Sequence, residues 1–223
     1  MTPLFALIFA GLAFLSFADA DKTARSVGVV AILLSLGLSL VRAALTAALA
    51  VVIHRFVILG EVAGVSDLPR LTPTILEFAA VTIVLQLVAA LALLLVVPAW
   101  GWLGSPVVAA LVFGVVFFLT VYAGLRIGLL FPAIAVEAPG RSVRSAFRDG
   151  DGLVLLLLMA CALSALVIVV PGVVVGAALG SAPALLPLAG VAMEMALIAV
   201  SVAIVSQVFT WRTRQLAAWS EAR

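Results

Sequence analysis

Apolar runs separated by short polar stretches are the main feature of this chain. Five long runs cover residues 27–53, 74–97, 106–126, 153–178 and 184–209, and a shorter run at residues 3–18 precedes them. A helix of about 20 apolar residues crosses the ~30 Å hydrocarbon layer of a bilayer. None of the runs alternates in polarity as the strands of a membrane barrel must. The pattern predicts an all-α, polytopic transmembrane bundle of six helices, with residues 1–223 forming a single integral membrane domain.

The first run, at residues 3–18, has two interpretations. It is shorter than the others and ends at Ala18-Asp19-Ala20, which resembles the cleavage site of a signal peptide. A signal peptide carries positive charge before its apolar stretch, whereas residues 1–10 contain no lysine or arginine. We therefore expect the run to be retained as a helix. In either case the second span begins on the same side of the membrane.

Composition indicates that most of the chain is surrounded by lipid. Hydrophobic residues make up 66% of the sequence and charged residues only 10%, whereas soluble domains carry roughly a quarter charged residues. The arginines are scattered over short segments without interleaved aromatic residues, so no nucleic-acid-binding surface is expected. Cys161 is the only cysteine, which excludes an intrachain disulfide.

Basic residues divide unequally between the two sides of the six-helix plan. Lys22 and Arg25 fall on one side. Nine arginines fall on the other side: Arg55, Arg70, Arg126, Arg141, Arg144, Arg148, Arg212, Arg214 and Arg223. The side richer in basic residues is usually cytoplasmic, so we expect both termini in the cytoplasm. Eleven arginines against one lysine, with no asparagine, are typical of a GC-rich genome and point to a bacterial inner membrane.

Three polar residues fall near the middle of their spans. At 1.5 Å per residue, Arg42, Gln86 and Glu194 lie ~18 to ~22 Å from the inner ends of their helices. A charge that faces acyl chains costs several kcal/mol, so we expect these residues to face one another, with Arg42 paired to Glu194. A buried ion pair that fixes helix register is the favoured interpretation. The alternative is a polar path or pocket for a small solute, a proton or a lipid headgroup.

A basic segment at residues 137–151 is predicted to lie at the cytoplasmic surface. Residues 140–151 are expected to form a short amphipathic helix with Arg141, Arg144 and Arg148 on one face. These three and Arg126, at the end of its span, are the candidate interfacial basic residues. Such a segment attracts anionic headgroups. It also serves as an ordinary positive anchor, which every multipass protein needs. Membrane lipids are the expected partners, while the sequence gives no protein partner or oligomeric state.

Recognisable catalytic and metal-binding motifs are missing from the sequence. His54 is the only histidine and has no second histidine or cysteine at helical spacing, so no metal site is expected. The chain contains no HExxH or GxSxG motif and no phosphate-binding glycine loop. Charges in solvated loops explain Glu61, Asp67 and Glu77. We assign no catalytic residue and no cofactor.

Two strings carry a resemblance to a known group of membrane proteins. One is His-Arg-Phe-Val-Ile-Leu-Gly-Glu, which contains His54, Arg55 and Glu61, and the other begins Arg-Ile-Gly-Leu at Arg126 and continues through Pro132-Ala133 to Ala146-Phe147. They resemble uncharacterised proteobacterial multipass proteins related to the membrane domain of some glycerophosphodiester phosphodiesterases. This chain has Gly150-Asp151-Gly152-Leu153 where that group continues Thr-x-Gly-Asn, so no role of the asparagine carries over. Neither does the phosphodiesterase chemistry, because the catalytic barrel needs ~250 further residues.

These patterns favour a non-catalytic accessory or lipid-interacting component of the bacterial envelope. One alternative is a small-solute or proton-coupled transporter or channel in which Arg42, Gln86 and Glu194 line the path. A second alternative is an enzyme that acts on lipid headgroups at the inner interface, using Glu61, Glu77 or Asp151 with Arg126. A transporter predicts a hydrated cavity that reaches the midplane cluster. An enzyme predicts carboxylates that converge with His54 in one pocket.

Overall fold

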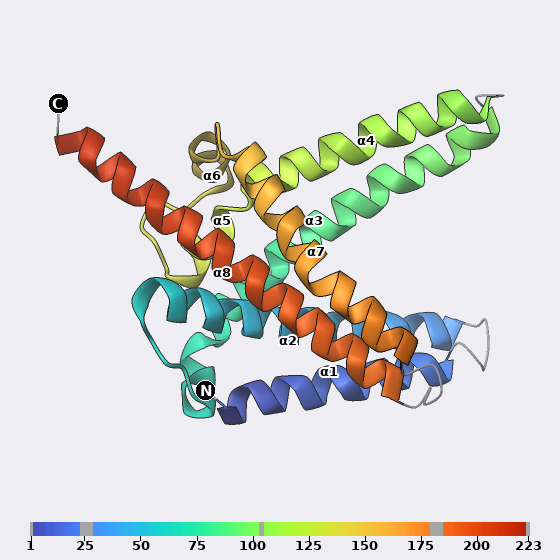
Figure 1. The fold of residues 1–223 in the computed structure, drawn as a ribbon, viewed down its shortest axis with the longest axis horizontal. Helices are drawn as coiled ribbons and strands as arrows, with labels where there is room; N and C mark the ends of the chain where they lie inside the picture. The colour runs from blue at the N-terminus through green and yellow to red at the C-terminus, as the bar shows by residue number, and fades with distance from the viewer. Residues whose placement is uncertain (1, 23–28, 103–104, 179–184, 222–223) are drawn as a thin grey trace.

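Three helical hairpins make up the protein (Figure 1). The computed structural model describes residues 2–22, 29–102, 105–178 and 185–221, and these ranges contain helices and no strand. The hairpins are α1 (Thr2–Lys22) with α2 (Val29–Leu59), α3 (Leu68–Trp102) with α4 (Pro106–Ile127), and α7 (Val154–Ala178) with α8 (Leu186–Glu221). Three shorter elements connect them: η1 (Val65–Asp67), α5 (Leu130–Ala135) and α6 (Val143–Asp149).

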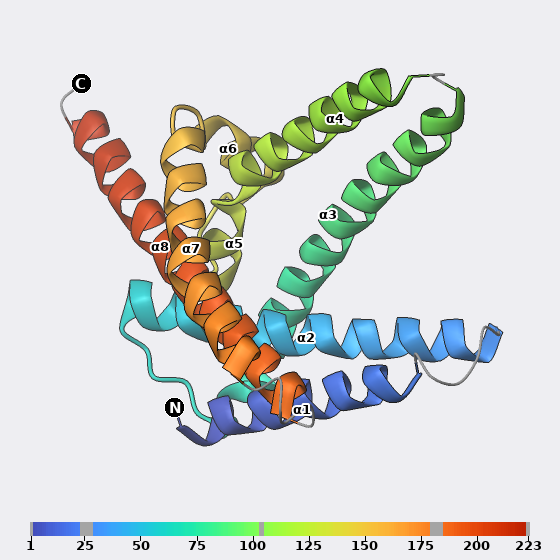
Figure 2. The same ribbon diagram turned by 45° about the vertical axis from the view of Figure 1, so that its right-hand side comes forward.

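The predicted membrane class is confirmed. Among the described residues, five helices are long and apolar enough to cross a bilayer, namely α2, α3, α4, α7 and α8. Within the residues of α1 whose side chains are described, the apolar stretch Leu4–Ala13 is shorter than a span. The chain is therefore an all-α, multipass membrane protein. The N-terminal end of α1 and the C-terminal end of α8 lie at the same side of the molecule (Figures 1 and 2).

The hairpins converge at one end of the molecule and separate toward the other (Figures 1 and 2). We call the converging end the arginine-rich end, because it contains Arg55, Arg126, Arg141, Arg144, Arg148 and Arg212. Toward the opposite end, the α3/α4 hairpin diverges from α2 and α8. Arg25 and Arg223, which also entered the predicted charge asymmetry, lie outside the described residues.

Helix α2 is the centre of the packed core. It packs against α1, α3, α5 and α8. Half of the most apolar stretch of its span, Gly37–Leu59, is buried within the protein, whereas none of the most apolar stretch of the span Ala110–Ala135, which includes most of α4, is buried. Leu4, Ile8 and Leu12 of α1 bury their side chains in the same cluster. Alanines at positions 47, 48 and 50 of α2 are buried there too, and small residues allow helices to approach closely. The outward-facing α4 is left to contact lipid over most of its surface.

The helices extend beyond the predicted spans at the arginine-rich end. Helix α2 continues from residue 53 to Leu59 and ends at Gly60, whose φ of +71° suits glycine after a helix. Helix α3 begins at Leu68 rather than at residue 74. As a result, His54 and Arg55, which the sequence placed at the inner interface, are buried with 1% and 4% of their surface exposed.

The segment after α4 also differs from the prediction. Residues Leu130, Pro132, Ala133, Ile134 and Ala135 of α5 are buried, and α5 packs between α2, α3 and α8. The part of the second resembling string that forms α5 therefore belongs to the core. The predicted amphipathic helix at residues 140–151 is shorter, since α6 begins only after Ser142, whose side chain accepts a hydrogen bond from the Ser145 backbone amide as an N-cap.

Candidate functional site

Arg42 and Glu194 meet between α2 and α8, and their predicted pairing is confirmed. The Arg42 Nε donates to Glu194 Oε1 at 3.3 Å, and the Arg42 Nη2 donates to Glu194 Oε2. This two-pronged geometry is the strongest way for a guanidinium to hold a carboxylate. The two side chains keep 36% and 28% of their surface exposed, so the pair lies at the edge of the packed helices rather than inside them.

Gln86 does not join the pair, contrary to the predicted three-residue cluster. It is exposed on α3, and within the part of the chain that the structure describes it has no hydrogen bond to Arg42 or Glu194. The cause is the course of α3, which diverges from α2 and α8 toward the end opposite the arginines (Figure 2). Equal depth in the membrane was therefore not enough to bring the three side chains together.

A second polar bridge joins α2 and α8 closer to the arginine-rich end. The Nδ1 of His54 lies 2.7 Å from the Oγ of Ser206. The Ser206 hydroxyl donates its single proton to the Val202 carbonyl at 2.8 Å, so it accepts from the Nδ1–H of His54. The sequence analysis did not predict this bridge, although the spacing of the residues on the two helices could have indicated it. His54 follows Arg42 by 12 residues and Ser206 follows Glu194 by the same 12, as two parallel helices in constant register require.

A groove lies between the two bridges, which are about 18 Å apart along the helices. Its volume is about 420 Å³. Helix α2 contributes Thr46, Ala50 and His54, α3 contributes Phe78 and Thr82, and α5 contributes Phe131. Helix α8 contributes Leu197, Ile198, Ser201, Val202 and Val205. Most of this lining is apolar.

The aromatic residues form the floor of this groove. The rings of Phe78 and Phe131 lie 4.8 Å apart between centroids, and the His54 ring is 5.9 Å from that of Phe78. At the opposite end, Thr46 is one turn from Arg42 and donates its hydroxyl to the Arg42 carbonyl at 2.9 Å. Thr82 likewise donates to the carbonyl of Phe78 at 2.9 Å. These hydroxyls are satisfied by their own helices.

Arg55 is the best-satisfied charge in the described structure. Its Nε donates to Glu61 Oε2 at 2.8 Å, and its Nη1 donates to the Ala135 carbonyl at 3.0 Å and to Glu137 Oε1 at 3.3 Å. The hydroxyl of Thr74 donates to the same Glu137 oxygen at 3.1 Å. The cluster ties the end of α2 to α3 and α5. The Arg55 guanidinium also lowers the pKa of the Glu61 carboxyl by donating to it.

Arg141 does not share a face with Arg144 and Arg148, which corrects the prediction. Arg141 precedes α6 and pairs with Glu77 of α3, at 3.1 Å from Nε to Oε1 and 2.7 Å from Nη2 to Oε2. This contact raises the pKa of Arg141. Arg126, Arg144 and Arg148 instead line one concave surface between α4 and α6. The split arises because α6 begins after Ser142, which leaves Arg141 outside the helix.

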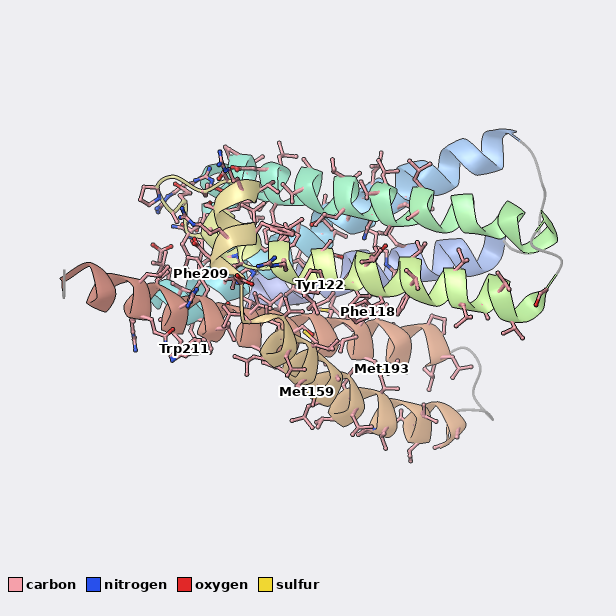
Figure 3. All side chains as sticks on the ribbon, turned by 90° about the horizontal axis from the view of Figure 1, so that it is seen from above. Phe118, Tyr122, Met159, Met193, Phe209 and Trp211 are labelled. Atoms are coloured by element: carbon pink, nitrogen blue, oxygen red, sulfur yellow. The ribbon has the colours of Figure 1, made fainter. Side chains whose placement is uncertain are left out.

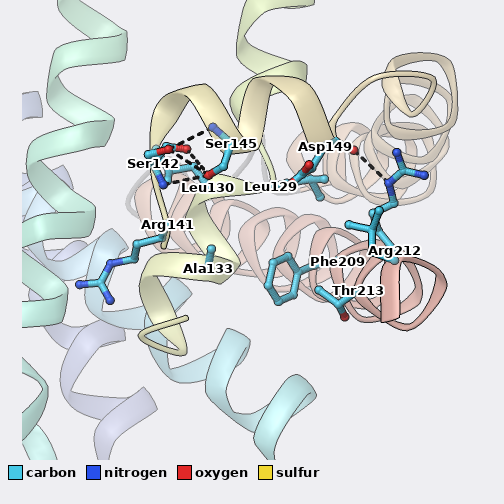
Figure 4. A pocket seen from close by; sticks show the side chains of 12 residues that line it. Leu129, Leu130, Ala133, Arg141, Ser142, Ser145, Asp149, Phe209, Arg212 and Thr213 are labelled. Atoms are coloured by element: carbon cyan, nitrogen blue, oxygen red, sulfur yellow. Dashed lines mark hydrogen bonds between the residues drawn. The ribbon is translucent and has the colours of Figure 1, made fainter. Parts of the chain in front are cut away.

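The carboxylates considered for an enzyme do not converge with His54. Glu61 pairs with Arg55, Glu77 with Arg141 and Asp151 with Arg126. A small pocket between α5, α6 and α8 is visible beside Arg141 and Arg212, where the Arg212 Nε donates to the Asp149 carbonyl at 3.2 Å (Figure 4). Its volume is only about 50 Å³. Among the described residues, no group of three His, Cys, Asp or Glu side chains is arranged to hold a metal ion.

Comparison with known proteins gives no relative. No protein-family model, no curated protein and no solved structure matches the chain.

Proposed function

We propose that the protein is a non-catalytic, lipid-interacting component of a bacterial inner membrane, with both termini in the cytoplasm. In this proposal the groove between α2, α3 and α8 receives an acyl chain of a membrane lipid. The observation that carries the proposal is the groove itself: an apolar surface inside a bundle whose charged neighbours already have partners. The predicted relationship to the membrane domain of glycerophosphodiester phosphodiesterases agrees with such a role and stays a prediction.

The size and chemistry of the groove support an apolar occupant. Its volume of about 420 Å³ falls within the ~300–1,000 Å³ that is usual for ligand sites, and such sites are lined mainly by hydrophobic and aromatic side chains. The hydroxyls of Thr46 and Thr82 are committed to carbonyls of their own helices. A methylene chain therefore covers these two threonines without leaving their hydroxyls unsatisfied.

The polar bridges at each end also favour binding over chemistry. Arg42 has Glu194, and His54 has Ser206. A general base needs a substrate within hydrogen-bond reach and a suitable proton affinity. His54 instead contacts a hydroxyl and an aromatic ring. The bridges hold α2 and α8 at a fixed register on either side of the groove.

A test compares two substitutions that differ by one residue on α8. Ser201→Phe places a ring in the groove, whereas Val200→Phe adds the same ring at a position with 41% exposure that is not part of the lining. We expect native mass spectrometry of the protein in mild detergent to detect a retained phospholipid in the unmodified protein and in Val200→Phe. The Ser201→Phe protein is expected to lose most of it. Equal retention in both variants, or no retained lipid in any of them, would contradict the proposal.

The exposure of the midplane pair supports one second candidate, a proton-coupled or small-solute transporter. Arg42 and Glu194 retain partial exposure, and the groove begins one turn away at Thr46. A transporter requires that water reach the pair through this groove. The test is uptake of protons or a small solute into liposomes that contain the protein. Uptake that is abolished by Glu194→Gln and left intact by Ser206→Ala would favour transport over lipid binding.

The orientation is tested separately from the groove. Nine basic residues on one side predict a cytoplasmic C-terminus. A C-terminal fluorescent-protein fusion is expected to fluoresce, and a C-terminal alkaline phosphatase fusion to be inactive. The reverse pattern would place the arginine-rich end outside the cytoplasm.

A further inference from the structure

The concave surface between α4 and α6 is chemically different from the groove. It has a volume of about 950 Å³ and is lined by Arg126, Arg144 and Arg148 together with Ser142, Ser145, Val143 and Phe147. No carboxylate lies among these lining residues. We call it the α4/α6 surface. Unlike Arg141, which Glu77 neutralises, Arg144 is exposed and has no ion-pair partner within the described ranges.

Arg126 is held in a fixed position at the inner edge of this surface. Its guanidinium carbon lies 4.4 Å from the centroid of the Phe147 ring and 5.7 Å from that of Tyr122. Its Nη2 contacts Asp151 Oδ1 at 2.5 Å, while its buried Nε has no hydrogen-bond partner among the described residues. A guanidinium has five N–H donors, so one carboxylate leaves most of them available to a further acceptor.

Arg144 and Arg148 add charge that is free to move toward a ligand. They lie four residues apart on α6 and therefore on the same face. Both side chains are exposed, and among the described residues Arg148 donates only to the neighbouring Asp149, at 3.3 Å. Three arginines around one concavity favour an anion with several oxygen atoms, and phosphate has the geometry that arginine binds best.

An aromatic row leads from Arg126 along α4 into the bilayer-facing region. Phe118, Tyr122 and Arg126 are spaced by four residues, and the first two rings stack with centroids 6.4 Å apart. Phe118 is 62% exposed and Tyr122 is half-buried, and Figure 3 shows the two side chains along α4. A free phosphate ion would not contact this apolar row, whereas the acyl chain of a lipid would pack against it.

We propose that the α4/α6 surface binds the phosphate group of an anionic membrane phospholipid, with the acyl chain of that lipid lying along Phe118 and Tyr122. The site is separate from the groove between α2, α3 and α8, so either one functions without the other. Arg126 provides the positioned donor at the base of the site, and Arg144 and Arg148 close over the phosphate from α6.

The test uses native mass spectrometry of the full chain titrated with phosphatidylglycerol. The variant is Arg144→Gln/Arg148→Gln, and the matched control is Arg214→Gln, an exposed arginine of α8 outside this surface. An interfacial arginine contributes about 5-fold to the binding of an anionic lipid, so we expect the double variant to bind the first phosphatidylglycerol about 30-fold more weakly. Because Arg214 lies outside the α4/α6 surface, the control is expected to weaken binding much less than the double variant does.

Two further arms identify the source of the phosphate. Phe118→Ala is expected to weaken the binding of phosphatidylglycerol, and millimolar inorganic phosphate is expected not to displace the lipid. Displacement by inorganic phosphate would assign the site to a free anion and overturn the proposal. Equal losses in the double variant and in Arg214→Gln would reduce the effect to general surface charge and overturn it as well. Loss of phosphatidylglycerol binding in Ser201→Phe alone would assign that lipid to the groove instead.

Discussion

Arg42 and Arg55 lie 13 residues apart on α2, and their surroundings differ sharply. Arg55 has 5% of its side chain exposed and three acceptors: Glu61, the Ala135 carbonyl and Glu137. Arg42 has 36% exposed and a single carboxylate partner on α8. The comparison shows that an arginine near the end of α2 is fixed in the packed core, whereas an arginine in the middle of α2 stays partly exposed and accessible. We expect this difference to appear in stability before it appears in any activity.

The largest effect is expected from removing Arg55. Arg55→Met strands Glu137 and the carbonyl of Ala135 at the junction of α2, α3 and α5. Arg55 is buried and donates three hydrogen bonds, and a hydrogen bond that involves a charged group contributes about 1.5–3 kcal/mol. The measurement is the midpoint of thermal unfolding in detergent, with the exposed Arg70→Met as the control. An Arg55→Met protein as stable as the control would show that the cluster does not hold the junction.

Removing Arg42 is expected to cost somewhat less stability than removing Arg55. The loss depends on whether Glu194 is replaced as well. Arg42→Leu leaves Glu194 as a lone charge in mid-membrane, at about 3 kcal/mol. Arg42→Leu/Glu194→Leu removes both charges and is expected to be more stable than either single variant. A double-mutant cycle measures this coupling. If the two single losses simply add, the pair does not contribute to stability as a unit.

A smaller loss is expected at the second bridge between α2 and α8. Ser206→Ala removes the acceptor of the His54 Nδ1–H in a buried site. An unsatisfied buried donor costs about 1–3 kcal/mol. The matched control is Ser66→Ala, at an exposed position before α3. A Ser206→Ala protein that unfolds at the same temperature as Ser66→Ala would mean that the hydroxyl does not support the register.

The smallest effect is a dependence on acid pH at the Arg55 cluster. Donation from Arg55 lowers the pKa of Glu61 in the folded protein. The stabilisation is therefore complete above the ~4.3 of a free glutamate carboxyl and is lost as the pH falls through the lower folded-state pKa. Glu61→Gln is expected to remove this part of the acid sensitivity. The comparison is between the unfolding midpoints of both proteins at neutral and acid pH.

The sequence predicted the features that follow directly from the hydrocarbon interior of the bilayer, namely the spans and the pairing of buried charges. Apolar length gave the spans, and the cost of a lone charge predicted that Arg42 meets Glu194. The prediction for Gln86 was wrong because depth along a helix says nothing about how neighbouring helices diverge. Arg141 was misplaced because α6 begins at Val143, three residues after the predicted start at residue 140, so its side chain precedes the helix.

The pattern of apolar residues could not predict two other features, helix α5 and the bridge between His54 and Ser206. Helix α5 is only six residues long, too short for its buried residues to show a helical repeat. The His54 to Ser206 bridge was open to prediction from the shared spacing of 12 residues, since a parallel helix pair fixed at Arg42 and Glu194 repeats its register. That inference needs α2 and α8 to be known as neighbours, which the pattern of each helix alone does not give.

A structure determined in nanodiscs with native lipids is the most direct test of the account. We predict an elongated lipid density in the groove between α2, α3 and α8, with Arg42 paired to Glu194 and no continuous file of water reaching them. A groove filled by ordered water from Thr46 to the arginine-rich end, or Arg42 and Glu194 turned apart toward separate partners, would contradict a lipid-binding role and support a path for solute.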